Sequence, residues 1–182
     1  MDWVDRLGRW WRIRKAERYI TLGATVLDVG CGDGALFRQL GARIGTGVGV
    51  DPNAPDSGGG SHTFVRDRFP TAHHLTGPFD VVTCLAMLEH VQIDEQPALA
   101  AELRRLVRPG GRVIVTVPSP LVDPIVDVLR FLHLGEGVAC EQHYGFEPGQ
   151  TRPLFEAAGF RTEVAKRFQL GLNNLFVFVA PV

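Results

Sequence analysis

The stretch from Val26 to Gly34, VLDVGCGDG, constrains the fold of this chain more than any other. Its apolar, β-branched start suits a strand that is buried on both faces of a sheet. The strand ends in three glycines at every second position, Gly30, Gly32 and Gly34, and glycines let the main chain turn sharply and approach a ligand closely. The stretch therefore predicts a buried strand followed by a turn that holds a nucleoside-bearing cofactor.

The rest of the chain alternates predicted strands with predicted helices. After the strand over 25–29, strands are expected over 46–50, 62–65, 79–85, 112–117, 160–168 and 172–179. Helices are expected over 35–40 and 150–158, and a third is capped by Asp94 and stopped by the sequence RPGG at 108–111. The loop PNAPDSGGGS after Asp51 has no helical pattern. This order predicts an α/β fold with a doubly wound parallel sheet and a ligand at the carboxyl ends of its strands.

Two segments lie outside this alternation. Residues 118–142 contain an apolar helix candidate after a strand end, and we expect a lid there. Residues 1–20 are predicted to form an amphipathic helix, with basic residues off an apolar stripe. The stripe consists of Trp3, Val4, Leu7, Trp10 and Trp11. It either packs on the domain or covers the cofactor site, or it makes a peripheral membrane contact, since Trp with Arg favours the headgroup layer.

Composition narrows the class of protein. The 182 residues suit one compact domain, and a net charge of −1 argues against a nucleic-acid surface. The three cysteines, Cys31, Cys84 and Cys140, form no Cys-x-x-Cys pair, so neither a disulfide framework nor a zinc site is predicted. There is no apolar run of the ~20 residues that a membrane-spanning helix needs, nor a secretory signal. A cytoplasmic enzyme fits best.

The glycine turn permits two kinds of cofactor. Gly30, Gly32 and Ala35 fit the dinucleotide pattern G-x-G-x-x-G/A, and Asp51 follows Gly30 by 21 positions, near the ~20 at which an acid meets a ribose hydroxyl. NAD is therefore one candidate. Asp28, two residues before Gly30, favours another, because a carboxylate repels a pyrophosphate and attracts a cationic amino or sulfonium group. S-adenosylmethionine carries both cations, and its adenine amino group could donate to Asp67.

Four stretches together resemble the class I S-adenosylmethionine-dependent methyltransferases, particularly the small-molecule branch that includes the quinone-biosynthesis methyltransferases. They are VLDVGCGDG, GVGVD, FDVVTCLAMLEHV and LVRPGGRVIVTVPSP, in this order over residues 26–120. The segments QHYGFEPGQTRPLFEAAGF and NNLFVFVA extend the resemblance more loosely. It implies a single methyltransferase domain over 1–182, with a Rossmann-like seven-stranded sheet in the order 3-2-1-4-5-7-6 and an antiparallel last strand.

The resemblance also implies a cofactor site. Asp28, Gly30 and Gly32 would surround the methionine end, Asp51 would bind the ribose and Asp67 would lie near the adenine. Leu85 and Ala86 would line the cofactor after the fourth strand. The neighbours of these residues complete the predicted site, which contains no metal: Cys31, Pro52 and Arg68.

Methyl transfer from a sulfonium is an in-line displacement, so a general base is needed only if the acceptor must lose a proton. His143 and His90 are the candidates, although each also fits a structural role. Cys31 is interpreted as a small space-filling residue. The fourth strand is not followed by the Asn/Asp-Pro-Pro-aromatic run of nucleic-acid and many amide N-methyltransferases, and with the charge balance this favours a small-molecule acceptor. The apolar lid over 121–134 and the aromatic N-terminus predict that the acceptor has a hydrophobic portion. An inactive, cofactor-binding partner subunit is the alternative, and an NAD-dependent reductase is less favoured.

Overall fold

A computed structural model describes residues 3–56, 60–70, 75–119 and 147–182, and side chains from Arg6 onward. The predicted lid falls mostly on residues 120–146, so it lies outside the described residues, as do His143 and Cys140.

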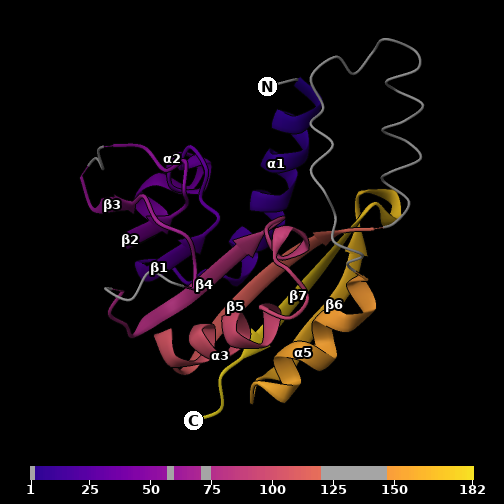
Figure 1. Cartoon of the computed structure of the whole chain (residues 1–182). Coiled ribbons are helices and arrows are strands. Elements are labelled where there is room, and N and C mark those ends of the chain that lie inside the picture. The colour runs from indigo at the N-terminus through magenta and orange to yellow at the C-terminus, as the bar shows by residue number, and fades with distance from the viewer. Residues whose placement is uncertain (1–2, 57–59, 71–74, 120–146) are drawn as a thin grey trace.

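A seven-stranded sheet forms the centre of the molecule (Figure 1). Its strand order is β3-β2-β1-β4-β5-β7-β6, and β7 runs antiparallel to both of its neighbours. The strands are β1 (Ala24–Val29), β2 (Ile44–Val50), β3 (His62–Val65), β4 (Phe79–Leu85), β5 (Val107–Pro118), β6 (Arg161–Phe168) and β7 (Asn173–Val179). The predicted fold class and strand order are confirmed.

Helices cover both faces of the sheet. The α-helices are α1 (Trp3–Ala16), α2 (Ala35–Leu40), α3 (Gln96–Leu106) and α5 (Thr151–Ala157). Short 3-10 turns are η1 (Glu17–Tyr19), η2 (Gly41–Arg43), η3 (Leu88–His90), η4 (Pro148–Gln150) and η5 (Gln169–Gly171). One core lies between the sheet and α3 with α5, and a second lies between the sheet and α1 with α2.

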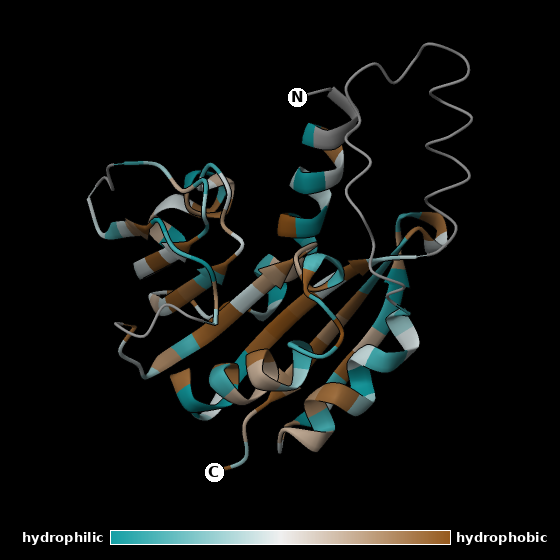
Figure 2. Cartoon of the chain, in the orientation of Figure 1, coloured by the Kyte–Doolittle hydropathy of each residue, from teal (hydrophilic) through white to brown (hydrophobic). Residues whose placement is uncertain are grey.

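The first core is built from a regular apolar stripe and a group of aromatic rings. Leu99, Leu103 and Leu106 of α3 are completely buried against the sheet. Phe155 of α5 stacks on Phe178 of β7 with ring centroids 4.4 Å apart. Hydrophobic residues accordingly dominate the strands, while hydrophilic residues mark the outer sides of α3 and α5 (Figure 2). This core holds the carboxyl ends of β4 and β5 in place.

Alternation along β1 decides which side chains meet the two helix layers. Leu27 and Val29 belong to the core under α3 and α5, whereas Val26 belongs to the core under α1 and α2. Since successive side chains of a strand point to opposite faces, Asp28 shares the α1 side with Val26. A buried carboxylate is thus aimed at the first helix of the chain.

Two local features differ from the predicted ones. The apolar stripe is not the buried side of α1: Leu7, Trp10 and Trp11 are 51%, 46% and 43% exposed, while Ile13 and Ala16 are buried. Asp94 does not cap α3, because the residue before the helix is Glu95 and no side chain caps it.

The connection between β2 and β3 contains no helix in its described residues, as predicted. None of the described helices is long and apolar enough to cross a membrane.

Candidate functional site

A cavity of about 500 Å³ opens at the carboxyl ends of β1, β2 and β4. It gathers seven of the residues that the sequence singled out: Gly30, Asp51, Pro52, Asp67, Arg68, Ala86 and His90. Asn53, Phe69, Met87, Val91 and Gln92 complete much of its lining. The predicted position of the ligand at this edge of the sheet therefore coincides with a cavity of cofactor size.

The three glycines of the turn have different reasons to be glycine. All have positive φ angles, between 51° and 76°. A Cβ on Gly30 would lie 2.6 Å from Met87 Cγ, and one on Gly34 would lie 2.5 Å from the Phe64 ring, so both positions are closed by packing. A Cβ on Gly32 would meet nothing within 4 Å. Gly32 therefore presents bare main chain to open space, where a ligand can approach it.

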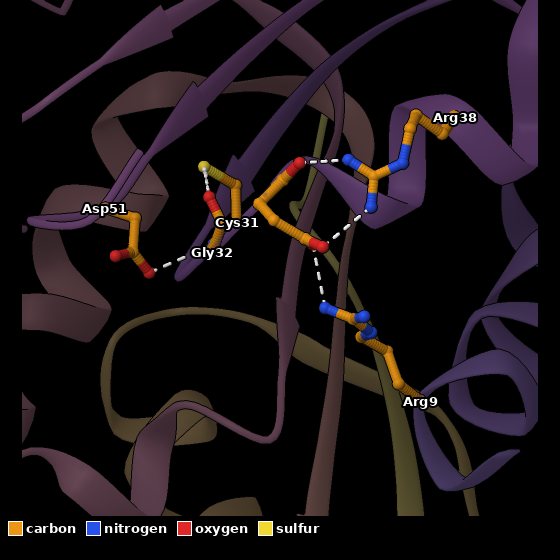
Figure 3. Close-up of polar contacts among 6 residues, drawn as sticks. Arg9, Cys31, Gly32, Arg38 and Asp51 are labelled. Atoms are coloured by element: carbon orange, nitrogen blue, oxygen red, sulfur yellow. Dashed lines mark hydrogen bonds and ion pairs between the residues drawn. The ribbon is translucent and has the colours of Figure 1, made fainter. Parts of the chain in front are cut away.

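Asp51 fastens this turn to the end of β2. Its Oδ2 accepts a hydrogen bond from the Gly32 N–H at 3.1 Å (Figure 3). Its Oδ1 accepts one from the Asn53 N–H at 2.7 Å. The Val50 carbonyl accepts from both Gly30 N–H and Cys31 N–H. Each carboxylate oxygen of Asp51 keeps a lone pair for a further donor, and the side chain lines the cavity.

Asp28 is a buried carboxyl group, only 4% exposed. Its strand partner in the sheet register is Thr83, whose hydroxyl donates to Asp28 Oδ1 at 2.7 Å. The pKa of Asp28 is raised to about 7, chiefly because the group is buried; the Thr83 hydrogen bond opposes this rise and the charge of Asp51 adds to it. A cation placed beside Asp28 would favour its ionised form.

A second, smaller cavity of about 50 Å³ lies next to Asp28. Its lining includes Cys31 and Leu85, two of the predicted residues, and also Arg9 and Arg12 of α1. Arg9 donates to Asp33 at 2.7 Å, and Arg38 approaches the same carboxylate from α2 (Figure 3). The first helix therefore contributes basic side chains to the glycine turn.

Burial and the neighbouring carboxylates raise the pKa of the Cys31 thiol far above its usual range. A Cβ on Gly49 would lie 2.8 Å from its sulfur. Cys31 is thus a neutral thiol that fills space.

The chain turns abruptly after β4. Ala86 has a φ of +55°, a left-handed conformation that costs a residue with a Cβ about 1–2 kcal/mol. Its N–H is fixed by the Thr116 carbonyl at 2.8 Å and by the Thr116 hydroxyl at 3.1 Å. This turn places Met87 under Gly30 and brings η3, with His90, to the cavity.

The third strand brings another pair of predicted residues to the cavity. Asp67 Oδ1 accepts a hydrogen bond from the Arg68 N–H at 2.7 Å, and the Arg68 guanidinium donates to Glu95 at 2.5 Å. Asp67 therefore lines the cavity just after β3, the strand next to the one that ends at Asp51.

Sequence reasoning missed Thr83, Arg9 and Arg12. The spacing of Arg9, Arg12, Ile13 and Ala16 at three or four residues could have revealed that these arginines share the buried face of the helix. Thr83 could have been found only from the register of β1 against β4. Among the residues that the structure describes, no group of His, Cys, Asp and Glu could hold a metal ion.

The charged groups and the open main chain around the glycine turn decide which ligand the site can hold. A buried carboxyl group lies beside the turn, an accessible carboxylate lies at the end of β2, and Gly32 presents an open cradle. Asp28 would repel a pyrophosphate at this turn, whereas Asp51 suits the ribose of either cofactor. The residues instead fit a ligand with a cationic end and hydroxyl donors, as S-adenosylmethionine has.

Comparison with known proteins supports this interpretation. A family model described as "Methyltransferase domain" matches residues 2–164. The ubiquinone biosynthesis O-methyltransferase of Pseudomonas paraeruginosa is 39% identical over 126 residues, which are 64% of this chain and 49% of that protein. The one from Aromatoleum aromaticum is 32% identical over 123 residues, 62% of this chain and 47% of that protein. The chain thus spans about half the length of the curated relatives it matches.

Solved structures share the fold. A 1,6-didemethyltoxoflavin-N1-methyltransferase from Burkholderia thailandensis, with bound S-adenosylhomocysteine, superposes with a TM-score of 0.73 at 20% identity, over 99% of this chain and 81% of that one. A magnesium protoporphyrin IX methyltransferase from Synechocystis, with bound SAH, gives 0.69 at 20% identity, over 99% and 88%. With the family match, the relatives and the fold in agreement, the resemblance to S-adenosylmethionine-dependent methyltransferases is confirmed, and the chain belongs to the methyltransferase domain family.

Proposed function

We propose that this chain transfers the methyl group of S-adenosylmethionine to a small-molecule acceptor that has a hydrophobic portion. The observation that carries the proposal is the pairing of a buried Asp28 with the accessible Asp51 on either side of a glycine turn with open space over Gly32. A carboxyl group without a cationic partner is costly to bury ionised, and a cationic ligand would remove that cost.

Each predicted residue has a part in this arrangement. Asp28 would bind the ammonium of the methionine half, next to the main chain of Gly30, Cys31 and Gly32. Asp51 would accept from the ribose hydroxyls, as its remaining lone pairs allow. Asp67 would accept from the adenine amino group. The remaining residues would enclose the cofactor: Pro52, Arg68, Leu85 and Ala86.

The basic residues of α1 would assist at the methionine end. Arg9 and Arg12 line the small cavity that also contains Asp28. An amino-acid end group carries a carboxylate beside its ammonium, so acidic and basic side chains that line one small cavity suit it. This complementarity supports placing the methionine half there.

The bound cofactor supplies a methyl group activated by its sulfonium charge. The protein then has to align the acceptor and keep water away, which needs no covalent nucleophile. His90 lines the large cavity and is our candidate for receiving a proton when the acceptor has one to lose. His143 lies outside the described residues and stays a prediction.

A hydrophobic acceptor is supported by the apolar side of the large cavity, formed by Phe69, Met87 and Val91. The curated relatives are named for ubiquinone biosynthesis, and a quinone precursor is therefore the first acceptor to test. We place the reaction in a reducing cytoplasm, which suits the buried free thiols of Cys31 and Cys84. An inactive cofactor-binding subunit is the alternative to test.

Calorimetric titration of the chain with S-adenosylmethionine, S-adenosylhomocysteine and NAD tests the cofactor. We expect the first two to bind and NAD not to bind; the reverse result would contradict the proposal. Incubation with a methyl-labelled donor and a panel of phenols, quinols and polar acceptors then tests activity. Binding without methylation of any acceptor would favour the inactive subunit, and methylation of polar acceptors alone would count against the hydrophobic acceptor.

A further inference from the structure

The exposed side of α1 carries large apolar side chains that have no part in the proposed cofactor site. Leu7, Trp10 and Trp11 are about half exposed, although large apolar side chains at such neighbouring positions are usually covered. The opposite side of the helix buries Ile13 and Ala16 and points Arg9 at the glycine turn. The apolar stripe therefore faces away from the domain.

Basic side chains surround this stripe. Trp10 and Trp11 line a surface hollow of about 360 Å³ together with Arg14, Lys15, Arg18 and Arg43. The hollow also contains Glu17, whose carboxylate is already paired with Arg14 at 2.8 Å and with Arg43 at 3.2 Å. Arg14 also lies over the Trp10 ring, 5.9 Å from its centroid. One carboxylate among four basic groups leaves the hollow positively charged.

The charge is local to this part of the molecule. Residues 1–20 hold six Lys or Arg and three Asp or Glu, whereas the whole chain has a net charge of −1. Hydrophobic and hydrophilic residues alternate along α1, which stands out beyond the ends of the strands (Figures 1 and 2). Tryptophan beside arginine on a projecting helix matches the interface between lipid headgroups and acyl chains, and the basic excess matches anionic headgroups.

We propose that this surface, formed by Leu7, Trp10, Trp11, Arg14, Lys15 and Arg18, binds a bilayer that contains anionic phospholipids. Its tryptophans enter the headgroup layer and its basic groups contact lipid phosphates. The inference rests on α1 and is independent of the proposed acceptor. Were that acceptor lipid-soluble, such binding would also bring the carboxyl edge of the sheet close to its source.

The position of the tryptophans provides a direct readout. All three tryptophans of the chain, Trp3, Trp10 and Trp11, lie in α1, so the intrinsic tryptophan emission reports on this helix alone. Vesicles of phosphatidylglycerol and phosphatidylcholine should shift the emission to the blue, and brominated acyl chains should quench it. Pure phosphatidylcholine vesicles should bind at least about tenfold more weakly, because they offer no net negative charge.

Co-sedimentation with the same vesicles tests the residues. The double variant Trp10→Ser/Trp11→Ser should lower the bound fraction at least about tenfold, and Arg14→Glu/Lys15→Glu should remove the preference for anionic lipid. Leu170→Ser is the matched control, since Leu170 is a fully exposed apolar residue on η5, and should bind as the unchanged chain does. Circular dichroism and calorimetric titration with S-adenosylhomocysteine verify that each variant is folded.

Three outcomes would overturn the proposal: no binding to anionic vesicles at low salt, binding that both double variants retain, or emission that vesicles leave unchanged. Self-association in the absence of lipid that is lost in Trp10→Ser/Trp11→Ser would instead assign the surface to a second copy of the chain. Loss of methyl transfer with vesicle binding intact would count against the proposed function and not against this surface.

Discussion

Asp28 and Asp80 lie on neighbouring parallel strands, Asp28 near the carboxyl end of β1 and Asp80 near the amino end of β4. The two carboxyl groups differ in their hydrogen-bond donors and in the direction of their pKa shifts. Asp80, at the start of β4, accepts from the N–H and the hydroxyl of Thr25, both at 2.8 Å, and from Arg108 at 2.6 Å. These hydrogen bonds, that of the Thr25 N–H first, hold its pKa below the usual range. Asp28, near the end of β1, has a single described donor, Thr83, and a raised pKa.

This difference between the two aspartates indicates that Asp80 stabilises the fold and that Asp28 binds a ligand. Asp80 joins β1 to β4 and to the start of β5, so its charge stabilises the folded chain by itself. Asp28 is buried where its charge is destabilising until a cationic ligand arrives. A carboxylate that weakens the free protein in this way is best explained by what it binds.

The largest expected effect comes from Asp28. Because its folded pKa, about 7, exceeds the ordinary 3.8, its contribution to stability is present at low pH and is lost as pH rises from about 4 to 7. At about 1.4 kcal/mol per unit, the loss approaches ~4 kcal/mol. Asp28→Asn should therefore raise the free energy of unfolding at pH 8, measured in urea, and leave it nearly unchanged at pH 4.

The same variant should weaken the binding of S-adenosylmethionine, because the amide carries no charge for the ligand's ammonium. A variant that is less stable than the unchanged chain at pH 8, or that binds the cofactor equally well, would remove the contrast between the two aspartates.

Asp80→Ala should act in the opposite way. We expect it to lower the free energy of unfolding at pH 7 by about 2–3 kcal/mol, because the Thr25 N–H and Arg108 lose a charged acceptor. Cofactor affinity should not change. The contribution of Asp80 should disappear as pH falls below about 3.8, the reverse of Asp28. Urea unfolding and calorimetry on one sample measure both quantities; reduced affinity in the folded variant would contradict the assignment.

Asp51→Ala should affect cofactor binding, as expected of a residue at the carboxyl ends of the strands. It should weaken cofactor binding by at least about 1 kcal/mol, roughly a factor of five or more, because two charge-assisted hydrogen bonds to the ribose are lost. Asn53→Ala is a suitable control, since Asn53 lines the same cavity and engages Asp51 through its main chain. An affinity unchanged by Asp51→Ala would place the ribose elsewhere.

The smallest effect is expected from Ala86→Gly. Glycine adopts the positive φ of this position without strain, although it also loses more entropy on folding. The free energy of unfolding should rise by about 0.5–1 kcal/mol, and thermal unfolding measures the change. Ala158→Gly is the control, because Ala158 follows α5 with a negative φ, and that variant should be destabilised. A destabilised Ala86→Gly would mean that the turn is not strained.

Much of the fold could be predicted from the sequence because the strands are short apolar runs bounded by glycine, proline or acids. β4 and α2 have the predicted bounds, and the acids and glycines lie at the predicted edge. The sequence could not show which side of an amphipathic helix is covered. Leu99 and Leu103 of α3 are buried, while Trp10 of α1 is exposed, and both helices have a regular apolar stripe.

Site residues that belong to a sequence motif could be predicted. Those that reach the site from an element distant in sequence could not. Asp28 and Asp51 follow from their places at strand ends. Arg12 reaches the same region from a helix, which depends on the rotation of α1 about its axis. That rotation is set by the packing of Ile13 and Ala16 under the sheet, a tertiary property.

The position of β7 also has a consequence for synthesis. This strand lies between β5 and β6, although it is the last of the seven to be made. The strand that covers this edge of β5 in the folded sheet is therefore missing while residues 119–172 are translated, several seconds at about 5–20 residues per second. An exposed apolar edge of this kind is prone to pair with other chains. The nascent protein is thus most vulnerable to aggregation just before its final strand leaves the ribosome.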